Sequence, residues 1–211
     1  MKKSYLFITV FFSGMTALAV ELSASRLIGN VYGSSNLVWA CVIGLILIYL
    51  TIGYWLGGKL ADKHPTPKFF YKVLMWGSLF VGLVPMISRP LLRVTANAFD
   101  QLQVPILAGA FITILILFVI PVTLIGMSLP FALKLVLQDT KSTGKVSGLL
   151  SAVSTLGSFI GTFLPVLVLI PLIGTYRTFL FFSSVLMLIA VLGYMLFVNV
   201  KSWLKHAWMP I

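Results

Sequence analysis

Six apolar stretches, each about 20 residues or longer, take up most of this 211-residue chain and leave little choice of fold. A helix needs about 20 apolar residues to cross the ~30 Å hydrocarbon layer of a membrane. Hydrophobic residues make up 60% of the chain and charged residues only 9%, whereas soluble domains have about 45–50% and about 25%. We therefore expect a single all-α transmembrane domain over residues 1–211. Its six helices are predicted at about residues 6–28, 37–57, 69–88, 104–129, 146–173 and 179–198.

The basic residues predict which way these helices run. One side of the predicted membrane domain carries eleven lysines, and the other side carries four arginines, Arg26, Arg89, Arg93 and Arg177. Cytoplasmic loops hold the excess of basic residues, so both termini are predicted to be cytoplasmic. Topology and contact with the lipid bilayer also account for the net charge of +11. No basic patch is interleaved with aromatic residues, so we expect no nucleic-acid partner.

Glu21 is the only acidic residue within a predicted helix, because Asp62, Asp100 and Asp139 fall in predicted loops. A carboxylate in hydrocarbon is costly unless it is paired, hydrogen-bonded or protonated. Glu21 is therefore the first candidate for a functional residue. Its helix also contains an unusual number of hydroxyl side chains, namely Ser13, Thr16, Ser23 and Ser25.

Two interpretations of Glu21 remain open. It binds a cationic group or a proton in the bundle interior, or it is structural and pairs with Arg26 or with Ser and Tyr hydroxyls. Arg26 is five residues further on, a rotation of about 140°, and lies near the membrane edge, where it can snorkel to water. Glu21 and Arg26 are candidate ligand-binding residues. Because amines bind carboxylates and aromatic faces, the aromatic residues of the second helix are further candidates. They are Tyr49, Tyr54 and Trp55.

The helices also suggest two sets of three. Gly53 and Gly57 form a Gly-x-x-x-Gly motif in the second predicted helix, and Gly157 and Gly161 form one in the fifth. Small residues four apart let helix backbones approach closely. Matching features in successive three-helix units are typical of the 3+3 inverted repeats of transporters, although ordinary packing explains the glycines equally well.

Proline is frequent in the third to fifth predicted helices, where it produces kinks or breaks. Pro121 and Pro130 fall late in the fourth helix, which we expect them to kink or end.

The segment after the second predicted helix reads GGKLADKH at residues 57–64. It resembles the cytoplasmic signature of the major facilitator superfamily, in which Gly58 and Asp62 occupy motif positions. We expect Gly58 to permit a tight exit from the helix, and Asp62 to cap the third helix or pair with a basic residue. The second part of the signature is missing, since residues 65–67 read PTP.

A wider resemblance covers nearly the whole chain. Residues 12–21 (FSGMTALAVE), 25–29 (SRLIG), 32–35 (YGSS), 57–62 (GGKLAD), 124–130 (LIGMSLP) and 154–162 (STLGSFIGT) are similar to the membrane domain of spermidine synthase-like transmembrane proteins. The resemblance implies a six-helix bundle like half of a major facilitator, often fused to a cytoplasmic aminopropyltransferase-like domain. This chain has no glycine-rich nucleotide loop, so any such activity would reside in a partner.

Three functions follow as expectations. The first is a membrane subunit that anchors a separate spermidine synthase-like protein on the cytoplasmic face and binds or passes a polyamine or another cationic small molecule. The second is a small-molecule transporter acting as a homodimer, and the third is a structural subunit of a larger complex. We expect no catalytic residues, cofactor or metal, because Cys41, His64 and His206 are isolated in the sequence. The predicted location is a prokaryotic cytoplasmic membrane.

Overall fold

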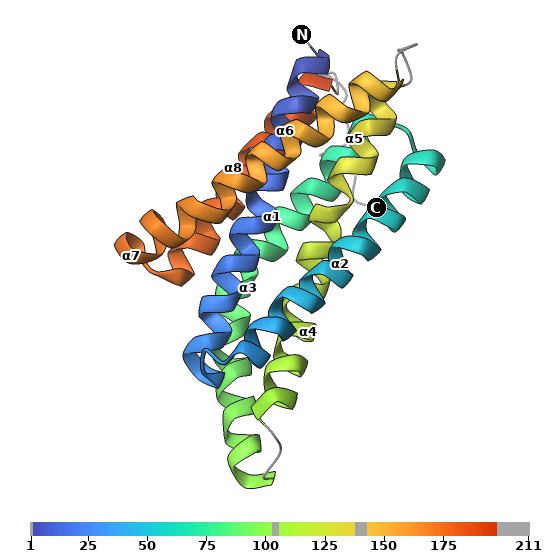
Figure 1. The fold of residues 1–211 in the computed structure, drawn as a ribbon. Helices are drawn as coiled ribbons and strands as arrows, with labels where there is room; N and C mark the ends of the chain where they lie inside the picture. The colour runs from blue at the N-terminus through green and yellow to red at the C-terminus, as the bar shows by residue number, and fades with distance from the viewer. Residues whose placement is uncertain (1, 103–105, 138–142, 198–211) are drawn as a thin grey trace, which may run out of the picture.

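The computed structural model describes residues 2–102, 106–137 and 143–197. These residues form helices joined by short connections, and no strand occurs among them (Figure 1). Helices satisfy their backbone hydrogen bonds internally, as a membrane-spanning segment must. Six helical spans in the described residues are long and apolar enough to cross a membrane, which confirms the predicted multi-pass helical class. They are Ser4–Tyr32, Asn36–Lys63, Pro67–Leu92, Leu107–Leu137, Thr143–Ile173 and Thr175–Phe197.

Two of the six spans are built from more than one helical element. The elements in chain order are α1 (Lys2–Tyr32), α2 (Asn36–Lys63), α3 (Pro67–Leu102), α4 (Ile106–Gly126), α5 (Ser128–Leu137), α6 (Thr143–Leu164), η1 (Pro165–Leu169), α7 (Ile170–Ile173) and α8 (Thr175–Phe197). The fourth span joins α4 to α5, and the fifth joins α6, the π-helical turn η1 and α7.

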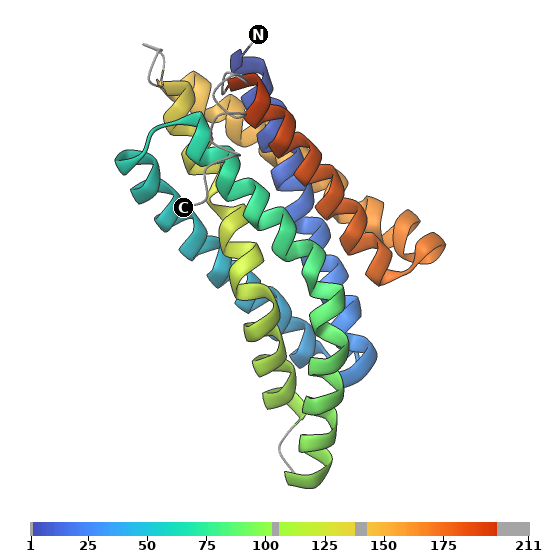
Figure 2. The same ribbon diagram turned by 180° about the vertical axis from the view of Figure 1, so that it is seen from behind.

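The helix α1 lies at the centre of the bundle. It packs most extensively against α6 and also contacts α8, α4 and α2, while α2 packs on α4, and α3 packs on both α8 and α4 (Figures 1 and 2). The start of α1, the connection from α2 to α3 and the start of α6 lie at one end of the bundle (Figure 1). The lysine-rich segments of the described chain are therefore gathered at that end.

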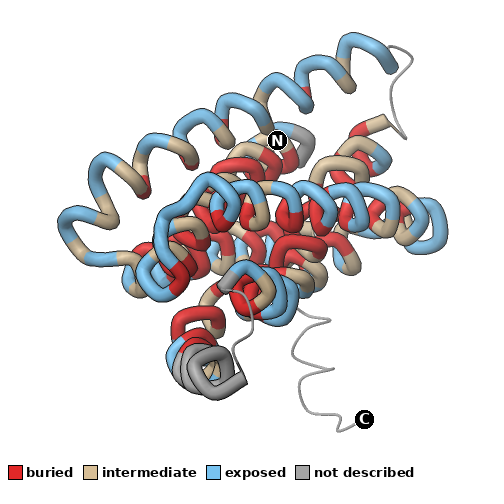
Figure 3. Tube along the Cα trace, turned by 60° about the horizontal axis from the view of Figure 1, so that its bottom comes forward, coloured by how far each residue is buried: buried red, intermediate tan, exposed pale blue. Residues whose placement is uncertain are grey.

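The helix α6 is the least enclosed of the spans. Only 17% of the apolar stretch of the fifth span, which consists of α6, η1 and α7, is buried, compared with 61% for the span formed by α1. Figure 3 shows burial confined to the inner edge of this outermost helix. A mostly exposed apolar surface is what a lipid-facing helix presents, so α6 touches the bundle chiefly through the strip that faces α1.

Large aromatic side chains fill the core at the end of the bundle where α1 begins. Phe70 and Tyr71 of α3 and Phe131 of α5 are almost fully buried. The rings of Phe70 and Phe131 are stacked with centroids 5.4 Å apart. This cluster also contains Leu6 and Val10 of α1, so it fixes the start of α1 against α3 and α5.

The prediction that a loop follows residue 57 is wrong. The helix α2 continues through Gly58 and Asp62 to Lys63, and the His64 backbone N–H bonds to the Leu60 carbonyl oxygen at 2.8 Å. Ala61 is buried in the aromatic core cluster, so packing extends the helix through the expected exit at Gly58.

The third helix is also longer than predicted. The helix α3 runs to Leu102 and so includes Asp100, which the sequence placed in a loop. Asp139, His206 and the lysines at positions 141, 201 and 205 lie outside the described residues.

The fourth span breaks near Pro130, as predicted, whereas Pro121 lies inside α4 without ending it. The helix α4 ends at Gly126, Met127 forms a turn, and α5 begins at Ser128 with Pro130 in its first turn. Proline is tolerated in a first turn because its missing N–H has no helical partner there. A second irregularity follows Leu164, where η1 begins at Pro165.

Candidate functional site

Glu21 lies on the central helix α1, surrounded by apolar side chains. Its residue surface is 8% exposed, and Ala17, Val20, Ala24 and Ile28 beside it belong to one core cluster. Within the described part of the chain, the Glu21 carboxylate has no hydrogen bond and no ion pair. A buried carboxylate without a partner is destabilising, so its retention favours a ligand that is not part of this chain.

Arg26 does not supply the missing charge. The Arg26 side chain is exposed, whereas Glu21 is buried on another face of α1. No ion pair joins the two in the described structure, which agrees with their separation of about 140° around the helix. The structural interpretation that pairs Glu21 with Arg26 therefore gains no support from the geometry.

The three aromatic candidates of α2 do not share one face. Tyr49 is 4% exposed, whereas Tyr54 is 46% and Trp55 is 60% exposed. Five and six residues along a helix correspond to rotations of about 140° and about 240°, so Tyr54 and Trp55 point away from the interior. Trp55 instead holds the ammonium group of Lys59 3.7 Å from its ring centroid. Only Tyr49 remains available to an interior site.

The Tyr49 hydroxyl is buried and has no hydrogen-bond partner among the described residues. The Tyr49 carbonyl oxygen accepts a hydrogen bond from Thr123 Oγ1 of α4 at 3.3 Å, which ties this part of α2 to the core. Buried tyrosine hydroxyls usually find a partner. The unpaired hydroxyl is therefore a second polar group, besides Glu21, that the described chain leaves without a partner.

The hydroxyl residues of α1 divide into two groups. Ser13 Oγ donates a hydrogen bond to Ser128 Oγ of α5 at 2.6 Å, and Thr16 Oγ1 donates to the Phe12 carbonyl oxygen at 2.8 Å. The Ser23 and Ser25 hydroxyls are buried without a partner in the described structure. Ser25 is one helical turn from Glu21 on the same face of α1, whereas Ser23 is on the opposite face.

Glu21 and Tyr49 lie at similar depth in the bundle. Glu21 is eleven residues before Tyr32, where α1 ends, and Tyr49 is thirteen residues after Asn36, where α2 begins. At about 1.5 Å per residue, they lie about 17 Å and about 20 Å from the turn that joins the two helices. We take these two residues and Ser25, which have no partner in the described structure, as the candidate polar site. Ser25 is four residues, about 6 Å, nearer to the turn than Glu21.

The glycine motifs occupy the closest helix crossings. A Cβ atom on Gly53 would lie 2.5 Å from the Thr123 carbonyl oxygen, and one on Gly57 would lie 2.7 Å from the Met127 Cα atom. On α6, a Cβ atom at Gly157 would overlap the Phe11 carbonyl oxygen. Gly161 meets Met15 of α1 in the same way. These glycines therefore bring α2 against the α4–α5 junction and α6 against α1.

Asp62 forms an ion pair at the end of α2. Lys134 Nζ of α5 donates a hydrogen bond to Asp62 Oδ1 at 2.6 Å, and both side chains are exposed. The start of α3 is capped by another residue, since the Phe69 N–H bonds to Thr66 Oγ1 at 3.4 Å. Of the two roles expected for Asp62, pairing is the one found.

Other cross-helix hydrogen bonds have no signal in the sequence. The Tyr32 hydroxyl donates to Thr95 Oγ1 at 2.6 Å and lies 2.8 Å from Thr113 Oγ1. These bonds tie the end of α1 to α3 and α4. Single hydroxyl residues in apolar stretches do not indicate which of them meet, so only the fold identifies this cluster.

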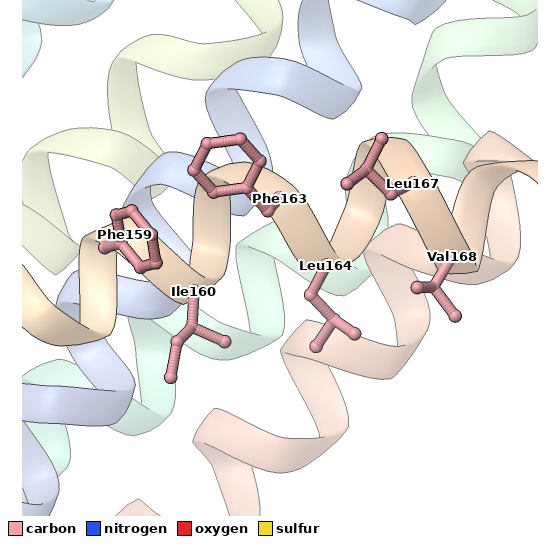
Figure 4. A pocket seen from close by; sticks show the side chains of 6 residues that line it. All are labelled: Phe159, Ile160, Phe163, Leu164, Leu167 and Val168. Carbon is pink, nitrogen blue, oxygen red and sulfur yellow. The ribbon is translucent and has the colours of Figure 1, made fainter.

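The described pockets are apolar and lie away from Glu21. A groove of about 370 Å³ on α6 and η1 is lined by Phe159, Ile160, Phe163, Leu164, Leu167 and Val168 (Figure 4). Such a groove suits lipid chains rather than a charged ligand. In the part of the chain that the structure describes, no group of three or more His, Cys, Asp or Glu residues could hold a metal ion.

We compared the chain with protein-family models, curated proteins and solved structures, and none of them matches it.

Proposed function

We propose that this multi-pass membrane protein binds a cationic small molecule of the amine class at Glu21. In this proposal it serves as the membrane subunit of a separate spermidine synthase-like protein on the cytoplasmic face. The observation that carries the proposal is the buried Glu21 carboxylate, which has no partner in the described structure. A cation supplies the charge that Arg26, exposed on another face of α1, does not supply.

An ammonium group fits this site better than an anion or a neutral ligand. The carboxylate attracts positive charge, and a charge-assisted hydrogen bond to it is stronger than a neutral one. One carboxylate balances one positive charge, so a polyamine would place one of its ammonium groups here.

The partner part of the proposal rests on the resemblance to spermidine synthase-like transmembrane proteins and on one surface. Five lysines at the end of the bundle where α1 begins have exposed side chains and no ion pair among the described residues. They are Lys59, Lys63, Lys68, Lys72 and Lys145. An acidic partner surface would be attracted to this face.

Native mass spectrometry of the tagged chain, extracted gently from the membranes of its own host, tests this proposal. A stoichiometric soluble partner with a nucleotide-binding fold is the expected result. Isolation of the chain by itself, with no soluble partner under conditions that preserve other membrane complexes, would contradict the subunit role.

The second candidate is a small-molecule transporter that acts as a homodimer. It is favoured by correspondences between the first three spans and the last three. The Gly-x-x-x-Gly motif of the second span packs on residues 123–127 of the fourth, and that of the fifth span packs on residues 11–15 of the first. Both contacted segments contain Gly-Met followed by a hydroxyl residue, at residues 14–16 and 126–128.

The helix contacts show the same correspondence between the first three spans and the last three. The third span packs on the fourth as the sixth packs on the first, and the third and sixth pack on each other. This pattern supports a 3+3 repeat like that of half a major facilitator. A homodimer without a soluble partner in the mass spectrum, followed by amine flux into vesicles, would favour this candidate over the subunit.

A further inference from the structure

We propose that the Glu21 site selects a primary ammonium group over a quaternary one, with the hydroxyls of Tyr49 and Ser25 as additional hydrogen-bond acceptors. This inference rests on the proposed function, because it assumes that Glu21 holds a cation. It adds the chemical class of the cation and two further binding residues.

The first support is the state of the two hydroxyls. Tyr49 is 4% exposed, and its hydroxyl has no partner within the described chain. The Ser25 hydroxyl is also buried and without a partner among those residues. Buried hydroxyls in folded proteins are nearly always hydrogen-bonded, so these two oxygens are available to accept hydrogen bonds from a ligand in the proposed site.

The second support is the position of these groups. Ser25 lies one turn from Glu21 on the same face of α1. Tyr49 is on the next helix, at a depth that differs from that of Glu21 by about 3 Å from the shared turn. The core cluster that includes the neighbours of Glu21 on α1 also includes Tyr49. In this proposal a small ligand between α1 and α2 contacts the Glu21 carboxylate and the Tyr49 hydroxyl.

The third support is the chemistry of the two cation classes. A primary ammonium has three N–H donors, which match one carboxylate and two hydroxyl oxygens. A quaternary ammonium has no donor and is usually held by a cage of aromatic faces. The other aromatic candidates of α2, Tyr54 and Trp55, are exposed and cannot complete such a cage. The site is therefore suited to hydrogen-bonded recognition.

Binding of two probes to the purified protein in lipid nanodiscs tests the inference. Butylamine and butyltrimethylammonium have the same alkyl chain and each carries one positive charge at neutral pH. We expect the wild-type protein to bind butylamine at least about ten-fold more tightly, because hydrogen bonds to charged groups are the stronger class.

Two variants assign the preference to the hydroxyls. Tyr49→Phe keeps the ring but removes the hydroxyl, and we expect it to lose about ten-fold in butylamine affinity with butyltrimethylammonium unchanged. Ser25→Ala should also reduce the preference for butylamine over butyltrimethylammonium. The matched control is Tyr54→Phe, which removes an exposed hydroxyl from the same helix and should leave both affinities unchanged.

The outcomes separate this inference from the function on which it rests. If both probes bind equally through Glu21, or if Tyr49→Phe and Ser25→Ala behave like Tyr54→Phe, the selectivity inference is wrong while cation binding stands. If the folded wild-type protein binds neither probe nor spermidine, the proposed function is overturned together with the inference. Thermal unfolding of each variant identifies any that fails to fold.

Discussion

Gly157 of α6 lies against the backbone carbonyl oxygen of Phe11 in α1, so closely that a methyl group on Gly157 would overlap it. One turn away on each helix, Gly161 meets the Met15 carbonyl oxygen in the same manner. Because α6 is buried chiefly along this strip, the two glycines carry much of its attachment to the central helix. Close backbone approach replaces the hydrophobic effect, which does not drive association between helices in lipid.

Replacing Gly157 with alanine should therefore weaken the bundle. The added methyl group forces α6 away from α1, and overpacking of this kind costs about 1–3 kcal/mol. The free energy of unfolding, measured by detergent-titrated circular dichroism, should fall by that amount. The matched control is Gly148→Ala, since a Cβ atom at Gly148 meets nothing within 4 Å.

Gly148→Ala should leave the unfolding free energy unchanged or raise it by up to about 1 kcal/mol, because alanine is the better helix former. Equal effects of the two substitutions would show that the crossing of α1 and α6 is not as close as described.

Replacing Glu21 with leucine should stabilise the protein in the absence of ligand. The carboxylate has no partner in the described structure, so leucine removes a desolvation cost and adds apolar surface. We expect a gain of about 1–3 kcal/mol in the free energy of unfolding. The structural interpretation of Glu21 predicts a loss of stability instead. If Glu21 bonds to neighbouring helices, its replacement with leucine would leave those partners unpaired.

The orientation of the bundle can be tested by cysteine accessibility. In a background with Cys41→Ser, a cysteine at Lys145 should react with a membrane-impermeant maleimide only from the cytoplasmic side. A cysteine at Arg177 should react only from the opposite side. Both positions have exposed side chains, so lack of reaction on either side would not result from burial. The reverse pattern would contradict the lysine-based prediction.

The number and approximate position of the spans could be predicted because length and hydropathy determine what crosses a membrane. The helix ends could not, since α2 runs to Lys63, six residues past the predicted end, and Ala61 in this extension is buried in the core cluster. Hydropathy decreases at the polar residues of this segment, whereas the hydrogen-bonded helix continues while tertiary packing favours it.

The candidate site was predicted only in part. Glu21 could be singled out because a lone acid in apolar sequence is unusual. The grouping of Tyr49 with Tyr54 was not supported, and helical periodicity already indicated the problem, because a rotation of about 140° separates them. The unpaired state of the Ser25 and Tyr49 hydroxyls depends on contacts between helices, which one sequence does not reveal.

Equilibrium binding of labelled spermidine to the purified protein in nanodiscs tests the central claim most directly, with Glu21→Gln as the comparison. Glutamine keeps the shape of the side chain and removes its charge. We predict saturable binding to the wild-type protein and a loss of at least about ten-fold in affinity for Glu21→Gln, with thermal unfolding preserved. Equal affinity of the two proteins for spermidine would contradict the claim that Glu21 is a cation-binding residue.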